Sequence, residues 1–292
     1  MEERRFAANI DLEQLFDSGQ TFLWEREGEG FVCRHLRGGV RARSVAGGFA
    51  LSPCGQADVA FWREYFDLDS DYGALLAPVL DAPLAAAMAA CPGLRLLRQD
   101  FFETLCAFIS SAHNAMPRIR RILRGLASLG DPPAFPTPRQ VAQAGVEGLR
   151  ALGLGYRAAY LHASACMVAD GLDASAFSAL DYEAALRLML RFPGVGEKVA
   201  DCVLLFSLGY RQAFPVDVWM LRAMESLYGL SGKPGQVKRQ AMERFGPNAG
   251  IAQMYLFHAY RKGLLRPETL ALGPAPGRPP LDSRDRDKVQ CR

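Results

Sequence analysis

The stretch Arg191-Phe-Pro-Gly-Val-Gly-Glu-Lys-Val-Ala-Asp-Cys202 is the most informative part of this sequence. An amphipathic segment over residues 181–191 ends here, and a second one over residues 197–208 begins directly after Pro193-Gly-Val-Gly196. The two glycines allow the backbone to turn sharply and to approach a partner closely. The second helix then presents its free amide groups and the positive end of its dipole outward. The stretch therefore predicts two helices joined by a tight hairpin.

This helix-hairpin-helix pattern suits an anion such as a DNA phosphate, because the exposed amides of a helix start can bind it. The expected contacts are Gly194, Val195 and Gly196. A Gly-x-Gly alone is equally typical of an ordinary connection between packed helices. The residues that follow the turn must decide between the two interpretations.

Lys198 lies in the first turn of the second predicted helix. The dipole and partial desolvation there disfavour the ammonium form, and an amine nucleophile must be neutral. A lysine at this place can equally be a phosphate contact. Farther along, Phe214-Pro-Val-Asp217 places a carboxylate just before another predicted helix, where an Asp is commonly an N-cap. If both residues belong to one site, Lys198 can attack a sugar C1′ while Asp217 stabilises the developing positive charge.

Upstream, short apolar segments separated by Gly-containing turns predict an antiparallel sheet between Gln20 and Pro53. After Asp58 the apolar spacing becomes helical. The predicted fold class is α+β, with a small N-terminal antiparallel sheet domain followed by helical subdomains that contain the helix-hairpin-helix motif. The expected strand segments are residues 21–24, 30–33, 40–45 and 49–51.

Asp100-Phe-Phe-Glu103 has the form of a capping box that opens an apolar helix toward Ser111. The Pro-, Arg- and Asp-rich end, residues 273–292, predicts a disordered tail. The expected division is a sheet domain with flanking helices at 1–95, a helical domain at 96–272 and the tail. Further helices are expected at 117–128, 156–169, 181–191, 197–208, 217–229 and 247–263.

Composition narrows the possible functions. No apolar run approaches the roughly 18 residues of a membrane span, and the start, Met1-Glu-Glu-Arg-Arg5, lacks the apolar stretch of a secretory signal. We therefore expect no membrane partner and an intracellular location, in cytoplasm or nucleoid if bacterial and in the nucleus otherwise. The net charge of +3 permits binding to an anionic polymer without arguing for it. The seven cysteines are scattered without a Cys-x-x-Cys pair, so neither a disulfide framework nor a zinc site is indicated.

Six segments together resemble the 8-oxoguanine DNA glycosylase family, and the resemblance extends over about residues 15–262. It implies a small N-terminal sheet domain, two helical subdomains and a DNA-filled cleft between them. The segments are Ser18-Gly-Gln-Thr-Phe22 with Trp24, Gly93-Leu-Arg-Leu-Leu-Arg-Gln-Asp100, Leu152-Gly-Leu-Gly-Tyr-Arg-Ala158, the hairpin through Cys202, Pro215-Val-Asp217 and Ala252-Gln-Met-Tyr-Leu-Phe257.

The resemblance makes Lys198 a Schiff-base nucleophile and Asp217 its electrostatic and proton-transfer partner. It implies three kinds of contact with an extruded base. Cys202 and Phe257 would hold the base between them, and Gln253 would hydrogen-bond its Watson–Crick edge. The backbone carbonyl of Gly19 would accept the N7 proton that 8-oxoguanine has and guanine lacks. Without the resemblance, Cys202 would be interpreted as a buried thiol, Gln253 as a surface side chain and Gly19 as a turn glycine.

A base can enter such a pocket only after it leaves the stack. The resemblance makes Tyr156 the wedge that fills the gap, with Arg118 and Arg157 holding the estranged cytosine. Two positions depart from the family. His113 stands where an asparagine commonly contacts the opposite cytosine, and Trp219 replaces a phosphate-contacting histidine of animal members. The expected DNA-binding residues are His113, Asn114, Arg118, Tyr156, Arg157, Gly194, Val195, Gly196 and Trp219.

The predicted function is excision of 8-oxoguanine from duplex DNA in base-excision repair, by a monomeric glycosylase and AP lyase that uses a lysine Schiff base. No cofactor and no metal are predicted. One alternative is an alkylated-base glycosylase that uses water, against which Lys198 argues. Another is a noncatalytic DNA-binding protein, which would bind without regard to the lesion and with strong salt dependence. A relative with an iron-sulfur cluster would need four closely spaced cysteines after Asp217, but only Cys291 follows that residue.

Overall fold

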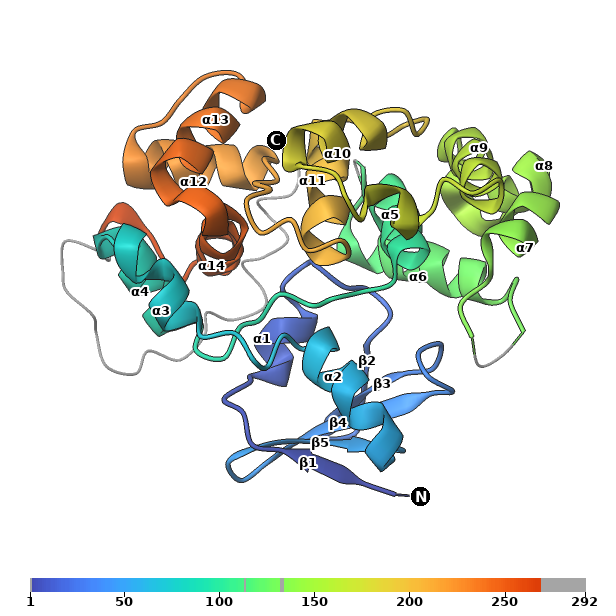
Figure 1. The fold of residues 1–292 in the computed structure, drawn as a ribbon, viewed down its shortest axis with the longest axis horizontal. Coiled ribbons are helices and arrows are strands. Elements are labelled where there is room, and N and C mark those ends of the chain that lie inside the picture. The colour runs from blue at the N-terminus through green and yellow to red at the C-terminus, as the bar shows by residue number, and fades with distance from the viewer. Residues whose placement is uncertain (1, 113, 132–133, 269–292) are drawn as a thin grey trace.

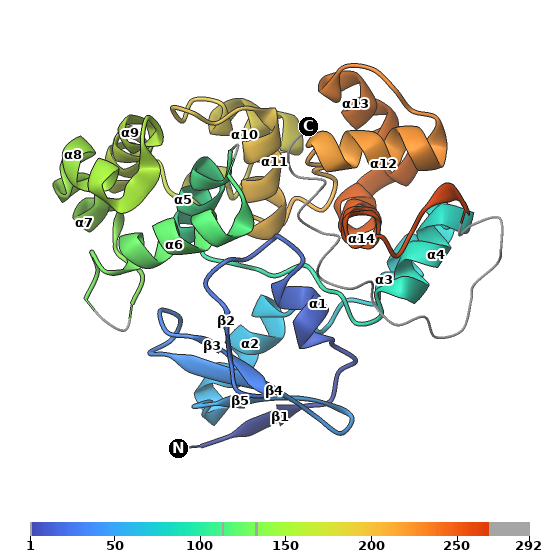
Figure 2. The same cartoon turned by 180° about the vertical axis from the view of Figure 1, so that it is seen from behind.

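The computed structural model describes residues 2–112, 114–131 and 134–268. A five-stranded antiparallel sheet forms one end of the molecule, and helices make up the rest (Figure 1). The same division is visible from behind (Figure 2). The expected α+β class is therefore confirmed. His113 and the predicted tail, 273–292, lie outside the described residues, and within those ranges no helix is long and apolar enough to cross a membrane.

The sheet has the strand order β1-β5-β4-β3-β2, and every neighbouring pair is antiparallel. Three of the expected strand segments are strands. The expected strand at residues 21–24 is wrong, because Gln20, Thr21 and the three residues after them are all buried without the alternation of a half-buried strand. The strands are β1 (Arg4–Phe6), β2 (Glu25–Glu27), β3 (Gly30–Cys33), β4 (Val40–Val45) and β5 (Gly48–Ser52).

One face of the sheet is covered by α1 (Leu12–Phe16) and α2 (Val59–Tyr65), which bury a cluster of aromatic rings. Phe16 stacks on Trp24 with ring centroids 4.3 Å apart, and Phe49 packs on Phe66 at 4.8 Å. Large aromatic side chains contribute much of the apolar area that such a small layer can bury. Because Phe16 and Trp24 are fixed on either side of it, the loop of residues 17–23 leaves the sheet at a defined place and runs up to the helices.

The helical part contains the six further helices expected from the sequence, each within two residues of its predicted start. Several short helices were not expected. The remaining helices are α3 (Tyr72–Leu76), α4 (Ala82–Ala90), α5 (Phe101–Ser111), α6 (Met116–Ala127), α7 (Pro138–Gln143), α8 (Gly145–Leu149), α9 (Arg157–Ala169), α10 (Tyr182–Met189), α11 (Glu197–Phe206), α12 (Val218–Tyr228), α13 (Pro234–Phe245) and α14 (Ala249–Arg261), with single turns at Gln56–Asp58, Ala77–Val79, Ala174–Phe177 and Gly246–Asn248 and a π-helical turn at Arg150–Leu154.

Helix α5 begins where the sequence predicted, and Asp100 is its N-cap. The Asp100 side chain accepts a hydrogen bond of 2.9 Å from the backbone amide of Glu103. The reciprocal bond of a capping box, donated by the Asp100 amide to the Glu103 side chain, is absent from the described part of the chain. The Asp100–Glu103 motif therefore acts as a simple N-cap, which still satisfies one of the free amides of the helix start.

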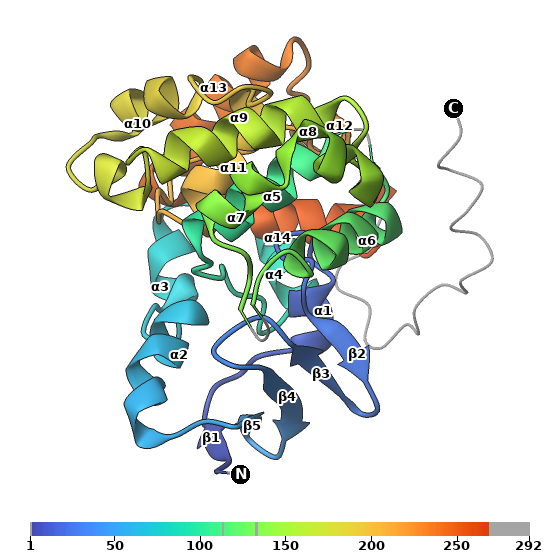
Figure 3. The same ribbon diagram turned by 90° about the vertical axis from the view of Figure 1, so that its right-hand side faces the viewer.

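The hairpin between α10 and α11 has the predicted sharp turn. Gly194 has a φ of +77°, and a Cβ atom added there would lie 2.5 Å from a ring carbon of Tyr160. A side chain at residue 194 would thus be strained by its backbone conformation and would clash with α9. The hairpin places α11 in the centre of the helical part, beside α5 (Figure 3).

Helix α14 reaches the same region from the other side. Its second residue, Gly250, donates a 2.7 Å backbone hydrogen bond to the Arg211 carbonyl in the segment that joins α11 to α12. Helix α4 packs along α14 (Figure 1). Part of the predicted sheet domain therefore lies with the helices, and the expected boundary at residue 95 stays a prediction.

Candidate active site

One pocket gathers side chains from five separate segments of the chain. The empty space between its walls, including the part that is open to solvent, is about 420 Å³. The predicted catalytic and base-binding residues all line it: Lys198, Asp217, Gly19, Cys202, Gln253 and Phe257. The other lining residues are Ser18, Gln20, Phe108, Phe206, Pro215 and Met254.

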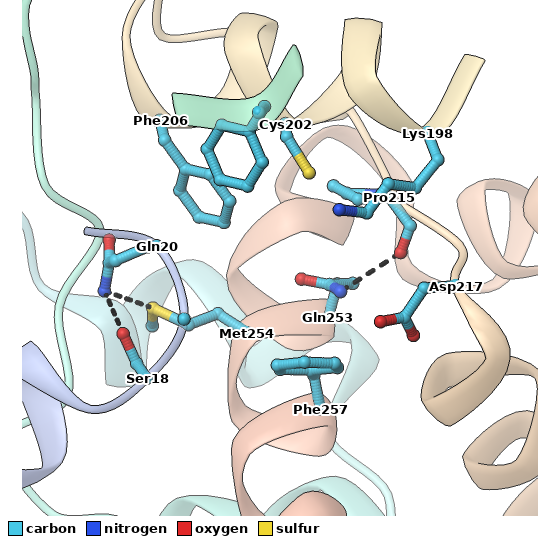
Figure 4. Close-up of a pocket in the computed structure, with 12 residues that line it drawn as sticks. Ser18, Gln20, Lys198, Cys202, Phe206, Pro215, Asp217, Gln253, Met254 and Phe257 are labelled. Atoms are coloured by element: carbon cyan, nitrogen blue, oxygen red, sulfur yellow. Dashed lines mark hydrogen bonds between the residues drawn. The ribbon is translucent and has the colours of Figure 1, made fainter. Parts of the chain in front are cut away.

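Helix α11 supplies one wall. Lys198, Cys202 and Phe206 follow one another at four-residue spacing, so they share a face of the helix. Figure 4 shows Lys198 and Cys202 extending from α11 toward the pocket. The Lys198 Nζ lies 5.1 Å from the ring centroid of Phe108 on α5. No carboxylate of the described residues forms an ion pair with Lys198.

The Cys202 thiol is a contact surface rather than a nucleophile. Only 3% of Cys202 is exposed. Burial raises the pKa of this thiol to about 12, although the nearby Lys198 acts in the opposite direction through its charge and a hydrogen bond. A thiol with that pKa stays protonated at neutral pH, and the protonated form is a poor nucleophile.

Asp217 combines two positions in one residue. It is the N-cap of α12, and its side chain accepts a 2.8 Å hydrogen bond from the Met220 amide. It also lines the pocket that Lys198 enters, beside Gln253 and Phe257 (Figure 4). The cap explains how the carboxylate is oriented, because one oxygen is fixed to the helix start while the group as a whole lies at the pocket wall.

Gln253 on α14 presents an acceptor to the pocket. Its Nε2 donates a 3.1 Å hydrogen bond to the Pro215 carbonyl. A carbonyl can only accept, so the amide nitrogen must face Pro215 and the side-chain oxygen must point away from it. Figure 4 shows that oxygen turned toward the middle of the pocket. Since Gln253 is 5% exposed, a group that enters the pocket meets a fixed hydrogen-bond acceptor.

Phe257 and Gly19 form the opposite wall. The Phe257 ring lies one turn beyond Gln253, on the other side of the pocket from Cys202 (Figure 4). Gly19 has a φ of +88°, and an added Cβ would lie 3.6 Å from Phe257 Cε1. A residue with a side chain would be strained at this φ, so glycine lets the backbone pass close to the ring.

Gln20 fixes the backbone next to Gly19, a role that the sequence did not predict. It is 2% exposed, and its Nε2 donates to Ser18 Oγ at 2.9 Å and to the Arg95 carbonyl at 2.8 Å. Its side-chain oxygen accepts from the Leu97 amide at 2.8 Å, and its main-chain carbonyl accepts from Gln99 Nε2 at 2.7 Å. These buried bonds hold the loop rigidly, because leaving any one of them unmade would cost free energy.

Three predicted DNA-binding residues lie at or near the start of α9 and α6. Tyr156 is 59% exposed, and the Arg157 guanidinium carbon lies 4.3 Å from the centroid of its ring. Arg157 itself is buried and donates to the Ala112 carbonyl. Arg118 is exposed and donates to the Gly153 carbonyl at 3.3 Å. The Tyr156 side chain is thus exposed to a partner, and the Arg157 guanidinium lies against its ring.

The other predicted DNA-binding residues have mixed exposure. Asn114 donates from its side chain to the Ser110 carbonyl at 2.8 Å, at the end of α5. Trp219 is partly buried, with the Arg222 guanidinium carbon 5.7 Å from its ring centroid. In the hairpin, Gly194 and Gly196 are exposed and Val195 is buried, while His113 lies outside the described residues. None of the described members of this set lines the pocket.

Metal ligands were not predicted. Among residues 2–112, 114–131 and 134–268, no group of three or more His, Cys, Asp or Glu side chains could hold a metal ion.

Comparison with known families matches nearly the whole described chain. Residues 5–105 match the family model described as 8-oxoguanine DNA glycosylase, N-terminal domain. Residues 106–247 match the model described as HhH-GPD superfamily base excision DNA repair protein. The boundary between the two models falls inside α5, the helix that directly precedes the first predicted DNA-binding residues.

Individual relatives are similar over most of their length. A probable N-glycosylase/DNA lyase of Methanothermobacter thermautotrophicus is 31% identical over 299 residues, which covers 88% of this chain and 96% of that protein. The structure of MBOgg1 with a low affinity DNA ligand has a TM-score of 0.85 at 29% identity and covers 91% of this chain and 100% of that one. The Clostridium acetobutylicum 8-oxoguanine glycosylase/lyase, bound to double-stranded DNA with cytosine opposite 8-oxoG, has a TM-score of 0.83 at 28% identity, with 91% and 99% covered.

Proposed function

Because this chain belongs to the 8-oxoguanine DNA glycosylase family, within the HhH-GPD superfamily of base excision DNA repair proteins, we propose that it excises 8-oxoguanine from duplex DNA through a Schiff base on Lys198. The chain is a base-excision repair DNA glycosylase with AP lyase activity. The observation that carries the finer proposal is the meeting of Lys198, Asp217 and the Cys202–Phe257 gap in one pocket.

The pocket suits a guanine-type base. A planar base would stack between the Cys202 sulfur and the Phe257 ring. The fixed oxygen of Gln253 would accept hydrogen bonds from the N1–H and N2–H groups of guanine's Watson–Crick edge, where adenine presents an acceptor at N1. These contacts alone fit guanine and 8-oxoguanine equally. They require the nucleotide to be flipped out of the duplex, which costs stacking energy that pocket contacts must return.

The carbonyl of Gly19 would separate the damaged base from the normal one. In 8-oxoguanine N7 carries a proton and can donate to this carbonyl, whereas N7 of guanine is an acceptor. A guanine in the pocket would leave the carbonyl unpaired, at a cost of roughly 1 to 3 kcal/mol. The rigid support from Gln20 favours this role, since a carbonyl that could turn away would not discriminate.

The proposed chemistry begins when the neutral Lys198 amine attacks the sugar C1′. A C1′–N bond forms, the bond from C1′ to the base breaks, and the electron pair leaves with the base, which takes up a proton. Asp217 stabilises the positive charge that develops on the sugar. Loss of the amine proton and opening of the sugar ring then give the Schiff base, and removal of a C2′ proton expels the 3′ phosphate. Strand cleavage thus follows base release without a redox cofactor.

The exposed residues around the pocket would grip the DNA. The free amides of the hairpin at the start of α11 suit a phosphate. Tyr156 is exposed enough to enter the gap that a flipped nucleotide leaves, and Arg157 stacks against its ring. We propose double-stranded DNA containing 8-oxoguanine as the partner, with Arg118, Asn114 and Trp219 as further contacts.

The test is single-turnover base release from duplexes that carry 8-oxoguanine opposite each of the four bases, with undamaged duplex as the control. We expect release only from the damaged duplexes and a preference among opposite bases that measures what His113 does. Lesion-independent binding without release would contradict the proposal and favour a binding protein. Release of alkylated bases but not of 8-oxoguanine would favour a glycosylase that uses water.

A further inference from the structure

Arg261, the last residue of α14, contacts one ring of the pocket and two segments beside the pocket. It donates to the backbone carbonyl of Asp17 and, at 3.7 Å, to the sulfur of Met116 at the start of α6. Its guanidinium carbon lies 5.6 Å from the centroid of the Phe257 ring. One side chain thus contacts the loop from the sheet, the start of a helix and an aromatic ring of the pocket.

The spacing along α14 explains the contact with the ring. Gln253, Phe257 and Arg261 follow at intervals of four residues and therefore share one face of the helix. Gln253 lies one turn before Phe257 and Arg261 one turn after it. Cys202 lies across the gap from one side of the Phe257 ring (Figure 4). The cation on the next turn can hold the ring in place through its attraction to the π electrons.

The contact with Asp17 acts on the other wall. The carbonyl that accepts from Arg261 is two residues before Gly19, and Gly19 itself lies against the edge of Phe257. Arg261 therefore bonds to the loop that carries Gly19 and packs on the ring that Gly19 touches. A movement of either wall would break one of its contacts.

The charges around Arg261 favour the same arrangement. Burial lowers the pKa of Arg261, and the carboxylates of Asp17 and Asp217 raise it, whereas Arg120 lowers it. An arginine stays protonated under these conditions. The adjacent Lys262 also contacts Asp17, but it does so through the side-chain carboxylate. Lys262 is therefore a matched control that anchors the same loop without touching Phe257.

We propose that Arg261 is a positioning residue for base recognition, which holds the Gly19 backbone and the Phe257 ring at the spacing that a flipped base requires. This inference rests on the proposed function, because it assigns the two walls to one base. It separates two steps. Base release needs both walls of the pocket. Strand cleavage at a site that has already lost its base needs only Lys198 and the residues that bind the DNA.

The experiment compares Arg261→Leu with Lys262→Met in two single-turnover assays. One measures base release from a duplex with 8-oxoguanine opposite cytosine, and the other measures strand cleavage at a preformed abasic site opposite cytosine. Arg261→Leu loses a part-buried hydrogen bond from a charged group and the contact with the Phe257 ring, so base release should slow about 10-fold or more. Cleavage at the abasic site should stay within about twofold. Lys262→Met should leave both rates within about twofold, as for a partly exposed ion pair.

Equal losses in both assays, or unchanged base release by a folded Arg261→Leu protein, would overturn the inference. Thermal unfolding checks folding. If Arg261→Leu does not fold, Arg261→Lys gives the same test, because it keeps the cation and loses the forked donors. If the wild type fails to release 8-oxoguanine, the proposed function is wrong and this inference falls with it. If the wild type is active and Arg261→Leu keeps its base release, only the inference is wrong.

Discussion

Lys198 lies on α11 and Lys238 forms an ion pair with the same helix, but the surroundings of the two lysines differ. Lys238 comes from α13, is 6% exposed and places its Nζ 2.7 Å from the Asp201 carboxylate. Glu197 lies 3.5 Å from the same nitrogen. Lys198 lines the open pocket beside Phe108 and has no ion pair among the described residues. Lys238 is buried and its charge is paired with carboxylates. Lys198 has no ion pair and lies where a substrate can reach it.

The difference has a physical cause in the packing of α11. Asp201 is fully buried, and it accepts a 2.6 Å hydrogen bond from the Tyr182 hydroxyl as well as the ion pair from Lys238. Burial raises the pKa of Asp201, while Lys238 and Tyr182 act in the opposite direction. Since those two groups use the carboxylate, it is not available to Lys198 three residues earlier. The ion pair between Asp201 and Lys238 therefore helps to keep Lys198 without an ion pair.

The largest expected effect comes from removing the open amine. Lys198→Gln should lower both base release and abasic-site cleavage by more than about 1000-fold, because the nucleophile itself is lost. Its unfolding temperature should stay close to that of the wild type, since Lys198 makes no ion pair in the described structure. Single-turnover kinetics and thermal unfolding measure the two quantities. A residual rate within tenfold of the wild type would show that Lys198 is not the nucleophile and would contradict the contrast between Lys198 and Lys238.

Removing the closed lysine should affect stability instead. Lys238→Met leaves Asp201 buried without its cation, which typically costs about 3 to 5 kcal/mol of unfolding free energy. The added change Asp201→Asn should recover part of that loss, because the uncompensated carboxyl is then gone. Denaturant unfolding measures the free energies, and abasic-site cleavage per folded molecule should stay near the wild-type rate. A stability loss below about 1 kcal/mol would show that the pair is not what holds α13 to α11.

The two roles of Asp217 can be separated by choice of replacement. Asp217→Asn should slow base release about 100-fold, because a charge that stabilises the transition state is lost. Asparagine still caps a helix, so stability should change little. Asp217→Ala should lose the cap as well, at about 0.5 to 2 kcal/mol of unfolding free energy. Equal activity of the Asn variant and the wild type would make Asp217 a cap only.

The smallest expected effect concerns Glu103 on α5, a partly buried acid without an ion pair in the described structure. Burial, with Asp100, raises its pKa to about 8 from an ordinary 4.5. The folded protein then holds a proton that the unfolded chain releases near pH 4.5. Its stability contribution is thus complete below that pH and is lost as the pH rises toward 8. Because the side chain is partly exposed, we expect only about 1 kcal/mol.

Glu103→Gln should therefore unfold about 2 to 4 °C above the wild type at pH 8 and at the same temperature near pH 4.5. Thermal unfolding at the two pH values is the measurement. A constant difference across that range would mean that Glu103 titrates normally, and that this partly buried acid does not need a cation as Asp201 does.

The resemblance to the 8-oxoguanine DNA glycosylase family predicted which residues form the pocket, and it rested on short motifs that are visible in the sequence. Lys198 and Cys202 follow a glycine turn, Asp217 follows a proline before a helix, and Gln253 and Phe257 share a helical repeat. The helices of the second half were predicted from their own residues, since their apolar periods are long. Local pattern was enough wherever the determinant was local.

What the sequence missed depends on distant partners. Strand β1 pairs with β5, more than forty residues away, and has no alternation of its own over three residues. The segment at 21–24 has strand-like composition but packs as a buried loop against Phe16 and Phe108. Gln20 and Lys238 are polar residues whose burial follows only from the groups that surround them. No feature of a single sequence marks such residues as internal.

The most direct test of the central claim is borohydride trapping with the wild-type protein and a duplex that carries 8-oxoguanine opposite cytosine, followed by digestion and mass mapping of the modified lysine. We expect a covalent adduct that forms only with the damaged duplex and maps to Lys198, with Lys238 unmodified. Base release without a trapped adduct, or an adduct on any other residue, would contradict it.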